Sequence, residues 1–268
     1  MKFNAFQEGN ISQYIDSNLD HSFWLFQHIP KTAGSSLVAE CNKHLSSYKN
    51  LHVGLQSTPH LSHPEKMDLV IEDFCKSKGN CQIASGHLRK THVDSILSAY
   101  PNTKLFTYVR HPVKRVISAY YYSLSNMHSS AETFKQKFPT LEDYAKHPIS
   151  QNQMTFFLNG SKNIKPDDLI NFVFNRFSFI GIQDIYPLSF KVLSTLLWNT
   201  SKPNQVQVRK NTAKKEANPE TFSLIMKNNR LDMKLYKAVQ NTYITHRDEL
   251  HSIINQKKSN NDRKRSLL

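Results

Sequence analysis

The stretch of sequence that decides the fold is Phe26-Gln27-His28-Ile29-Pro30-Lys31-Thr32-Ala33-Gly34-Ser35-Ser36-Leu37. An apolar strand runs into a tight turn that carries a lysine, a glycine and three hydroxyl side chains, and a helix opens directly after it. Backbone N–H groups at a helix N-terminus lack intrahelical partners, the helix dipole favours an anion there, and Lys31 adds a positive charge. The stretch therefore predicts a phosphate-binding loop. The seven glycines nowhere satisfy G-x-x-x-x-G-K-[ST], so the loop differs from the usual ATP- and GTP-binding version.

On both sides of this loop, apolar runs of strand length alternate with segments of helical periodicity. This pattern predicts an α/β protein with a P-loop-like three-layer fold, in which a central parallel sheet is flanked by helices and the C-terminal half is helix-rich. The expected strands are Ser22–Gln27, Cys81–Ser85, Lys104–Val109 and Phe179–Gly181, with Leu51–Leu55 as a candidate short strand. The expected helices are Ser35–Ser46, Pro64–Lys76, His92–Tyr100, Val113–Leu124, Leu141–Lys146, Gln151–Leu158, Lys165–Phe177, Tyr186–Trp198, Pro219–Asn228 and Leu231–Ile254.

The length of 268 residues is enough for one sizeable core. We expect an N-terminal extension over residues 1–21, a single domain over residues 22–255, and a basic, disordered tail over residues 256–268. The first twenty residues contain no apolar signal-peptide core, which favours a cytoplasmic location. The three cysteines include no C-x-x-C pair and the thirteen histidines are scattered, so we expect neither a disulfide framework nor a metal site.

The formal net charge of +14 favours an acidic ligand, because a strongly positive surface concentrates anions around it. Nucleic acid is one candidate. However, no helix-turn-helix, zinc finger or aromatic RNP-like strand motif accompanies the charge. We therefore expect no specific nucleic-acid partner.

A second strand-to-helix junction follows the strand Lys104–Val109. Arg110 ends that strand, and Pro112 opens the next helix, since the missing N–H of proline is not needed there. Ser118 lies two turns into this helix, near enough for its hydroxyl and the Arg110 guanidinium to bind one phosphate. The spacing alone equally allows an arginine that caps sheet carbonyls and a serine that faces solvent.

A third junction, Gly86-His87, ends the strand Cys81–Ser85. In open parallel sheets ligands bind at the carboxyl ends of the strands. The loop Lys31–Ser36, the pair Gly86-His87 and the residues Arg110 and Ser118 should therefore converge on one site.

Two of these stretches resemble a known family. His28-Ile29-Pro30-Lys31-Thr32-Ala33-Gly34-Ser35-Ser36-Leu37 and Tyr108-Val109-Arg110-His111-Pro112-Val113-Lys114-Arg115-Val116-Ile117-Ser118-Ala119-Tyr120-Tyr121 resemble motifs of the sulfotransferases related to heparan sulfate 2-O-sulfotransferase. The first is similar to the 5′-phosphosulfate loop of that family and the second to its 3′-phosphate motif. The resemblance covers residues 22 to about 245 and continues, in the order of the family, through Gly86-His87, Gln153 to Gly160, Gly181-Ile182-Gln183-Asp184, Lys210-Asn211-Thr212 and Asp232 to Tyr236.

The resemblance implies an enzyme that moves a sulfuryl group from 3′-phosphoadenosine 5′-phosphosulfate to an acceptor hydroxyl and releases 3′,5′-ADP. The donor carries a phosphosulfate at one end and a separate 3′-phosphate at the other, so its binding requires two anion sites. The family works without a metal ion, and the absence of the ATP-type loop motif fits this.

The resemblance also implies roles for individual residues. Lys31 would contact the bridging oxygen between phosphate and sulfate, where charge develops as the leaving group departs; the alternative is that it only neutralises phosphate charge in the ground state. Arg110 and Ser118 would hold the 3′-phosphate, and Arg115 would lie near it or face solvent. Gly34 would allow close approach of the backbone. The residues expected to contact the 5′-phosphosulfate are Lys31, Thr32, Ala33, Gly34, Ser35 and Ser36.

His87 matches the position of the proposed catalytic base of that family. Imidazole has a pKa suited to removing the proton of an acceptor hydroxyl near neutral pH. His28 and His111 are the rivals, because both flank the binding loops and could instead hold a supporting position. The three tyrosines Tyr120 to Tyr122 are interpreted as core and rim aromatics without a catalytic role.

Lys210-Asn211-Thr212 resembles the segment of the family that closes over the nucleotide, so we expect the loop Ser201–Glu216 to act as a partial lid. The alternative is a charged surface loop. The resemblance favours a carbohydrate or glycoconjugate hydroxyl as the acceptor, and the positive charge would suit an acidic glycan. A small cytoplasmic glycan, a glycolipid precursor or a metabolite is an equal alternative, and the acceptor-binding residues are expected in the helical C-terminal half. Two other functions compete: a nucleotide-dependent kinase with a degenerate phosphate loop, and a non-catalytic binder of anionic glycans.

Overall fold

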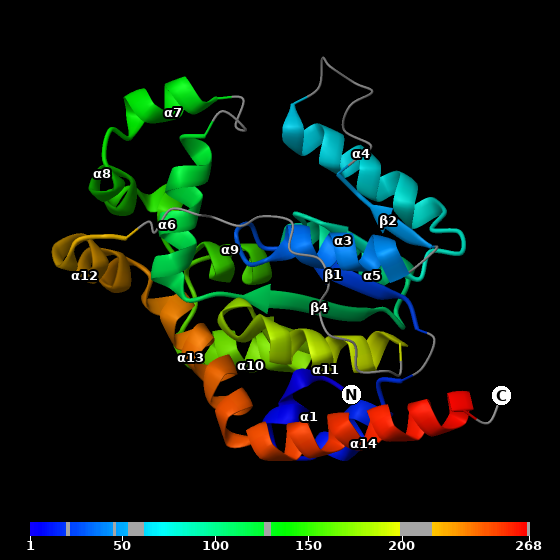
Figure 1. Cartoon of the computed structure of the whole chain (residues 1–268). Helices are drawn as coiled ribbons and strands as arrows, with labels where there is room; N and C mark the ends of the chain where they lie inside the picture. The colour runs from blue at the N-terminus through cyan, green and yellow to red at the C-terminus, as the bar shows by residue number, and fades with distance from the viewer. Residues whose placement is uncertain (20–21, 45–46, 53–61, 126–129, 199–215, 267–268) are drawn as a thin grey trace.

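The computed structural model describes residues 1–19, 22–44, 47–52, 62–125, 130–198 and 216–266, with the side chains of residues 44, 63 and 257–266 left out. Its centre is a five-stranded sheet in which every pair of neighbours is parallel and the order is β2-β3-β1-β4-β5 (Figure 1). The strands are β1 (Trp24–Gln27), β2 (Tyr48–Asn50), β3 (Ile83–Gly86), β4 (Lys104–Val109) and β5 (Phe179–Ile182). The predicted α/β class and parallel sheet are confirmed.

The strands form because their residues are buried on both faces. Every residue of β1, β3, β4 and β5 is buried, which is typical of parallel strands covered by helices on both sides. Helices follow each strand, and all of them except α7, which was not predicted, have bounds within a few residues of those predicted. They are α3 (Gly34–His44), α4 (His63–Lys76), α5 (Lys90–Ala99), α6 (Pro112–Ser123), α7 (Ala131–Lys137), α8 (Leu141–Lys146), α9 (Gln153–Asn159), α10 (Pro166–Arg176), α11 (Tyr186–Trp198) and α12 (Pro219–Asn228).

Successive side chains of a strand point to opposite faces of the sheet, so the contacts of β1 and β4 identify the helices that cover each face. The ring of Phe26 packs on those of Phe106 and Tyr108, and Tyr108 in turn packs on Tyr186 of α11, so α11 covers that face. The next side chain along β1, Gln27, points to the opposite face, where its amide donates hydrogen bonds to the Leu88 and Phe157 carbonyls at 3.0 and 2.7 Å. Since Phe157 belongs to α9, the molecule has three layers.

Residues 1–19, expected as an N-terminal extension, pack into the same hydrophobic core as the sheet. They contain two short helices, α1 (Phe3–Gln7) and α2 (Ile11–Asp16), whose apolar side chains Phe3, Phe6, Tyr14 and Ile15 are buried. The backbone N–H of Phe3 donates to the Phe177 carbonyl at 2.7 Å, and the Tyr14 hydroxyl donates to the Ser178 carbonyl at 2.5 Å. Both hydrogen bonds hold α1 and α2 against the two residues that precede β5.

The C-terminal helix differs from the prediction in two ways. The expected helix Leu231–Ile254 is divided at His246 into α13 (Arg230–Thr245) and α14 (Arg247–Ser266). The helical backbone of α14 also continues through most of the segment expected to be disordered. Lysine and arginine are good helix formers and the segment contains neither glycine nor proline, while buried Leu250 and Ile254 anchor the start of α14. Figure 1 draws α14 beside α1, and α14 contacts α2, so the first and last helices of the chain pack together.

The candidate strand Leu51–Leu55 is misplaced. The strand β2 covers Tyr48–Asn50 instead, pairing with β3 from Tyr48 opposite Ile83 to Asn50 opposite Ser85, and residues 53–55 lie outside the described residues. Leu51 is buried directly after the strand, which explains why its apolar character was mistaken for the strand itself. Among the helices described, none combines the length and the apolar character needed to cross a membrane.

Candidate anion-binding and catalytic site

The neighbouring parallel strands β1 and β4 form a switch point, because the chain leaves them toward opposite edges of the sheet. From β1 the chain leaves through α3 toward the side of β2 and β3, whereas from β4 it leaves through α6 toward the side of β5. Such a switch point opens a crevice at the carboxyl ends of the strands and is the usual ligand position in open parallel sheets. The predicted phosphate loop and the Arg110 junction flank this point from its two sides.

The loop between β1 and α3 has a backbone suited to anion binding. Lys31 and Ala33 have φ angles of 71° and 81°, which are uncommon for residues other than glycine. Residues that alternate between left- and right-handed conformations turn successive N–H groups toward a common point and form a concave anion site. The buried Thr32 hydroxyl donates to the Ile29 carbonyl at 2.8 Å and holds the loop from within. Ser35 is exposed and Ser36 half-buried at the start of α3.

Gly34 is required for a different reason from the one expected. A Cβ atom at this position would lie 1.8 Å from Nε2 of His28, because the His28 ring lies directly over the glycine. The His28 ring itself is stacked on Phe26, with centroids 5.2 Å apart and planes at 17°. The glycine therefore makes room for a side chain of the protein, and the approach of a ligand is not needed to explain it.

Arg110 links the two loops. Its Nη1 donates to the Lys31 carbonyl at 3.1 Å, while its Nε is buried without a hydrogen-bond partner. Burial lowers the pKa of the guanidinium, and the nearby Asp184 opposes this effect. The arginine does hold a carbonyl, as one of the sequence alternatives proposed, but that carbonyl belongs to the phosphate loop and not to the sheet. An arginine with an unused buried donor beside an anion-type loop fits an acidic ligand.

The Lys31 ammonium lies over the ring of Tyr122, 3.8 Å from its centroid, in a cation–π contact. Tyr122 is near the end of α6 and was predicted to have no functional role. Ser118 is half-buried one turn earlier on the same helix, at the i, i+4 spacing that places two side chains on one helix face. The helix α6 therefore presents both side chains on the face that meets Lys31.

Asp184 caps the start of α6. It accepts hydrogen bonds from the His111 backbone N–H at 2.9 Å and from the Lys114 ammonium at 2.6 Å, and the Tyr236 hydroxyl also contacts it. Burial acts to raise the pKa of Asp184, but the bonds from Lys114 and His111 lower it overall. Burial, together with the Asp184 charge, raises the pKa of Tyr236 to about 12. Because a carboxylate already occupies this helix N-terminus, an anion here would be bound by side chains.

Of the two expectations for Arg115, the solvent-facing position is wrong, and a position near the expected 3′-phosphate site stays a prediction. Arg115 is buried, and its Nη2 donates to the Ser150 carbonyl at 2.7 Å. Its positive charge also acts on the neighbouring Arg110, whose pKa is lowered first by burial and also by Arg115. Arg115 joins α6 to the segment before α9 and has a structural role.

His87 is half-buried at the end of β3 and is held at two points. Its Nδ1 lies 2.8 Å from the His28 carbonyl oxygen, and its backbone N–H donates to Nε2 of His52 at 2.6 Å. A carbonyl can only accept, so Nδ1 carries a proton, and the neutral form of the ring then has its lone pair on Nε2. This tautomer is the one that a general base requires.

The two rival histidines lie in less suitable surroundings. Burial first, and then the neighbouring His87, His52 and Lys31, lower the pKa of His28 well below its usual range, and its ring is enclosed between those of Phe26 and His87. His111 packs against Tyr236 with ring centroids 5.3 Å apart, and burial lowers its pKa while Asp184 opposes the change. We therefore retain His87 as the candidate base.

Two further segments of the resemblance, Gln153 to Gly160 and Asp232 to Tyr236, are joined by hydrogen bonds at the starts of their helices. The buried carboxylate of Asp232 accepts hydrogen bonds from the backbone N–H groups of Met154 and Thr155 at 3.0 and 2.8 Å, which caps the start of α9. In return, Asn152 Oδ1 accepts from the Leu231 and Asp232 N–H groups near the start of α13. These residues support the site without lying in it.

The expected nucleotide-closing residues Lys210, Asn211 and Thr212, with the loop Ser201–Glu216 except its last residue, lie outside the described residues. Among the side chains that are described, no three or more of His, Cys, Asp and Glu gather as a metal ion would need. The three histidines His28, His52 and His87 are close together, but their rings pack against one another and do not converge on a common point.

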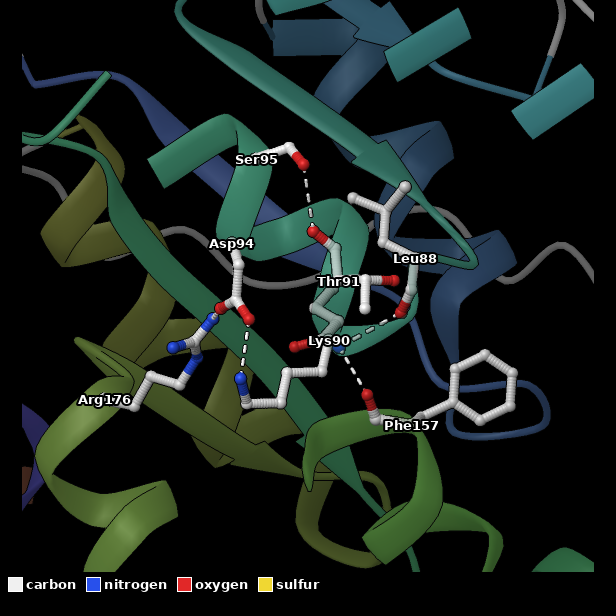
Figure 2. A network of polar contacts seen from close by, with 8 residues as sticks. Leu88, Lys90, Thr91, Asp94, Ser95, Phe157 and Arg176 are labelled. Carbon is white, nitrogen blue, oxygen red and sulfur yellow. Dashed lines mark hydrogen bonds and ion pairs between the residues drawn. The ribbon is translucent and has the colours of Figure 1, made fainter. Parts of the chain in front are cut away.

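Two hollows on the described surface lie away from these residues. One, of about 450 Å³, is lined mainly by apolar side chains between the start of α11 and the junction of α13 and α14. The other, of about 740 Å³, lies between α4 and α5 and includes Asp94, which Figure 2 shows bound by both Lys90 and Arg176. None of the predicted site residues lines either hollow. We place the site by its chemistry and its switch-point position, because hollow volume alone does not supply polar groups that converge on a ligand.

No family model matches the chain, and no curated protein matches it either.

Proposed function

We propose that this protein is an O-sulfotransferase that uses 3′-phosphoadenosine 5′-phosphosulfate as its sulfuryl donor. The observation that carries the proposal is the hydrogen bond between Arg110 Nη1 and the Lys31 carbonyl. This bond joins the two strand-to-helix junctions that the sequence assigns to the two anionic ends of the donor. Their position at the β1–β4 switch point supports a shared ligand.

In this proposal the loop after β1 binds the phosphosulfate end of the donor. The positive φ angles of Lys31 and Ala33 and the start of α3 supply backbone N–H groups, and the Lys31 ammonium supplies positive charge. Arg110 and Ser118 bind the 3′-phosphate through side-chain donors. The unused Nε of Arg110 supports this assignment, since a phosphate oxygen would satisfy it.

His87 acts as the general base. Its Nε2 takes the proton of the acceptor hydroxyl while the hydroxyl oxygen forms a bond to sulfur and the bond from sulfur to the bridging phosphate oxygen breaks. Lys31 stabilises the charge that develops on that oxygen, and 3′,5′-ADP departs with the electron pair. The tautomer fixed by the His28 carbonyl supports this role for His87.

The acceptor is proposed as a hydroxyl of a carbohydrate or glycoconjugate, with an acidic glycan favoured by the net charge of +14. A cytoplasmic location, the nucleotide-closing role of residues 210–212 and the absence of a metal requirement remain predictions of the same proposal.

The experiment is a transfer assay with isotopically labelled donor and a panel of hydroxylated acceptors in the presence of a metal chelator, with His87→Ala as the test variant. We expect labelled product from the unaltered protein, and a fall in turnover of about two to four orders of magnitude in the variant with nearly unchanged affinity for 3′,5′-ADP. Turnover that barely changes would remove His87 from the role of base.

A second arm separates the two other functions. A ligand selective for the native state raises the melting temperature. Stabilisation by ATP with Mg²⁺ but not by 3′,5′-ADP would favour a kinase. Salt-dependent binding of an anionic glycan without any sulfuryl transfer would favour a non-catalytic binder.

A further inference from the structure

His52 is brought next to the candidate base by the edge of the sheet. It follows β2 by two residues, and the Leu51 N–H between them donates to the Ser85 carbonyl at 2.9 Å, which continues the pairing of β2 with β3. The His52 N–H donates to Asn50 Oδ1 at 3.0 Å and turns the chain at this point. His52 and His87, 35 residues apart in the sequence, thus meet at the ends of two paired strands.

The contact between them fixes the chemistry of the His52 ring. Nε2 of His52 accepts the His87 backbone N–H at 2.6 Å, so this nitrogen carries a lone pair and not a proton. The two rings also meet edge to face, with centroids 4.6 Å apart and planes at 60°. A single imidazole therefore binds the backbone of His87 and limits the movement of its ring.

His87 is enclosed from its other side by His28. The His28 ring lies with its centroid 4.1 Å from that of His87, and the His28 carbonyl accepts from Nδ1. One histidine thus holds the side chain of His87 and the other holds its backbone. Together these contacts fix both the backbone and the ring of His87.

We propose that His52 is a positioning residue for the base of the transfer reaction, a role that rests on the proposed function. It accepts the His87 N–H directly after β3 and keeps the His87 backbone in the orientation that directs Nε2 toward the acceptor hydroxyl. Groups that orient a reacting side chain typically contribute a factor of about 10 to 100 in activity.

The test compares His52→Leu with His52→Gln. Leucine removes the acceptor for the His87 N–H, whereas the side-chain oxygen of glutamine restores an acceptor at a similar reach. We expect kcat to fall about 10- to 100-fold in His52→Leu with the KM for the donor unchanged, and to recover most of its value in His52→Gln. His251→Leu on α14, outside the site, is the matched control and should keep the kcat of the unaltered protein.

A second readout does not depend on an acceptor. In protein labelled with ¹⁵N-histidine, the ring signals of His87, assigned by their loss in His87→Ala, should show a protonated Nδ1 and an unprotonated Nε2 near neutral pH. These signals should shift in His52→Leu and return in His52→Gln.

The outcomes separate the two proposals. Absence of transfer by the unaltered protein with every acceptor would contradict the proposed function, while the ring signals would still test the placement of His87 by His52. Unchanged kcat and unchanged His87 signals in His52→Leu would overturn the positioning role. Equal losses in His52→Leu and His52→Gln would overturn it too, because the hydrogen-bond acceptor would then not be what matters.

Discussion

The two strand-to-helix junctions at the centre of the sheet are built in contrasting ways. After β1 the chain passes through Lys31 and Ala33, which have positive φ angles, and α3 begins at Gly34. The donors at this helix N-terminus are therefore backbone N–H groups. After β4 the helix α6 begins at Pro112, and the N–H of the preceding His111 already donates to the Asp184 carboxylate.

Under the proposed function, this difference divides anion binding between backbone donors at the first junction and side-chain donors at the second. The dipole of α3 and its first N–H groups favour an anion in the loop after β1. The carboxylate of Asp184 offsets the same effect at α6, which leaves the Arg110 guanidinium and the Ser118 hydroxyl as the donors of the second junction. Since Arg110 also holds the Lys31 carbonyl, a change at one junction should be felt at the other.

The largest effect is expected from Lys31→Ala at the first junction. If Lys31 acts on the leaving group, kcat should fall by roughly two to three orders of magnitude, because charge develops on the bridging oxygen only in the transition state. Affinity for 3′,5′-ADP should fall much less. Steady-state kinetics with labelled donor, paired with calorimetric binding of the nucleotide, measure both. A loss of affinity as large as the loss of kcat would limit Lys31 to neutralising phosphate in the ground state.

Arg110→Ala should break the link between the junctions. We expect affinity for 3′,5′-ADP to fall about 10- to 100-fold, because a charge-assisted contact and the anchor of the Lys31 carbonyl are both lost. Affinity for 5′-AMP, which lacks the 3′-phosphate, should also fall but by less, since only the anchor is lost. An unchanged affinity for 5′-AMP would show that the Arg110–Lys31 bond does not maintain the phosphate loop.

Gly34→Ala should destabilise the folded protein at the first junction, independently of any ligand. The added methyl group would meet the His28 ring, which is enclosed by Phe26 and His87 and cannot easily move. We expect the free energy of unfolding to fall by about 1 to 3 kcal/mol in urea denaturation. The double variant Gly34→Ala/His28→Ala should lose less than the sum of the two single variants, because the clash is absent. Strict additivity would mean that the ring and the glycine do not constrain each other.

The smallest effect is expected from Asp184→Asn at the second junction. The native carboxylate has a lowered pKa, so its contribution to stability is present above the unfolded-state pKa of about 4 and is lost as pH falls through the lower folded-state value. At pH 7 the variant should lose about 1 kcal/mol of unfolding free energy, and the difference from the unaltered protein should shrink below pH 4. A difference that stays constant down to acid pH would indicate that the carboxylate charge is not what caps α6.

Much of the sheet could be predicted from the sequence because its signals are local. The strand Lys104–Val109 and the helices Leu141–Lys146, Tyr186–Trp198 and Pro219–Asn228 have the predicted bounds. Each is marked by a continuous apolar run, by periodicity or by a proline at the first turn. The helices α1, α2 and α7 were missed, since five, six and seven residues give little periodicity and none of the three begins with a side-chain cap.

The parts of the site that were missed depend on contacts between distant residues. Nothing in the neighbourhood of Tyr122 indicates that its ring meets Lys31, and nothing near His52 indicates that it binds the backbone of His87. Asp184 lies 73 residues along the chain from His111, whose N–H it accepts at the start of α6. These pairings follow from strand order, which the sequence pattern alone did not supply. The contact between Gly34 and the His28 ring could not be predicted either, because Phe26 of β1 and His87 after β3 together set the position of that ring.

The central claim is that two junctions of different construction bind the two ends of one donor nucleotide. It is tested most directly by calorimetric titration of the unaltered protein with 3′,5′-ADP and with 5′-AMP, each in the presence of a metal chelator. The account predicts that 3′,5′-ADP binds without metal and at least about 10-fold more tightly than 5′-AMP, the factor that a charge-assisted contact to the 3′-phosphate supplies. Equal affinities for the two nucleotides, or binding only when Mg²⁺ is restored, would contradict it.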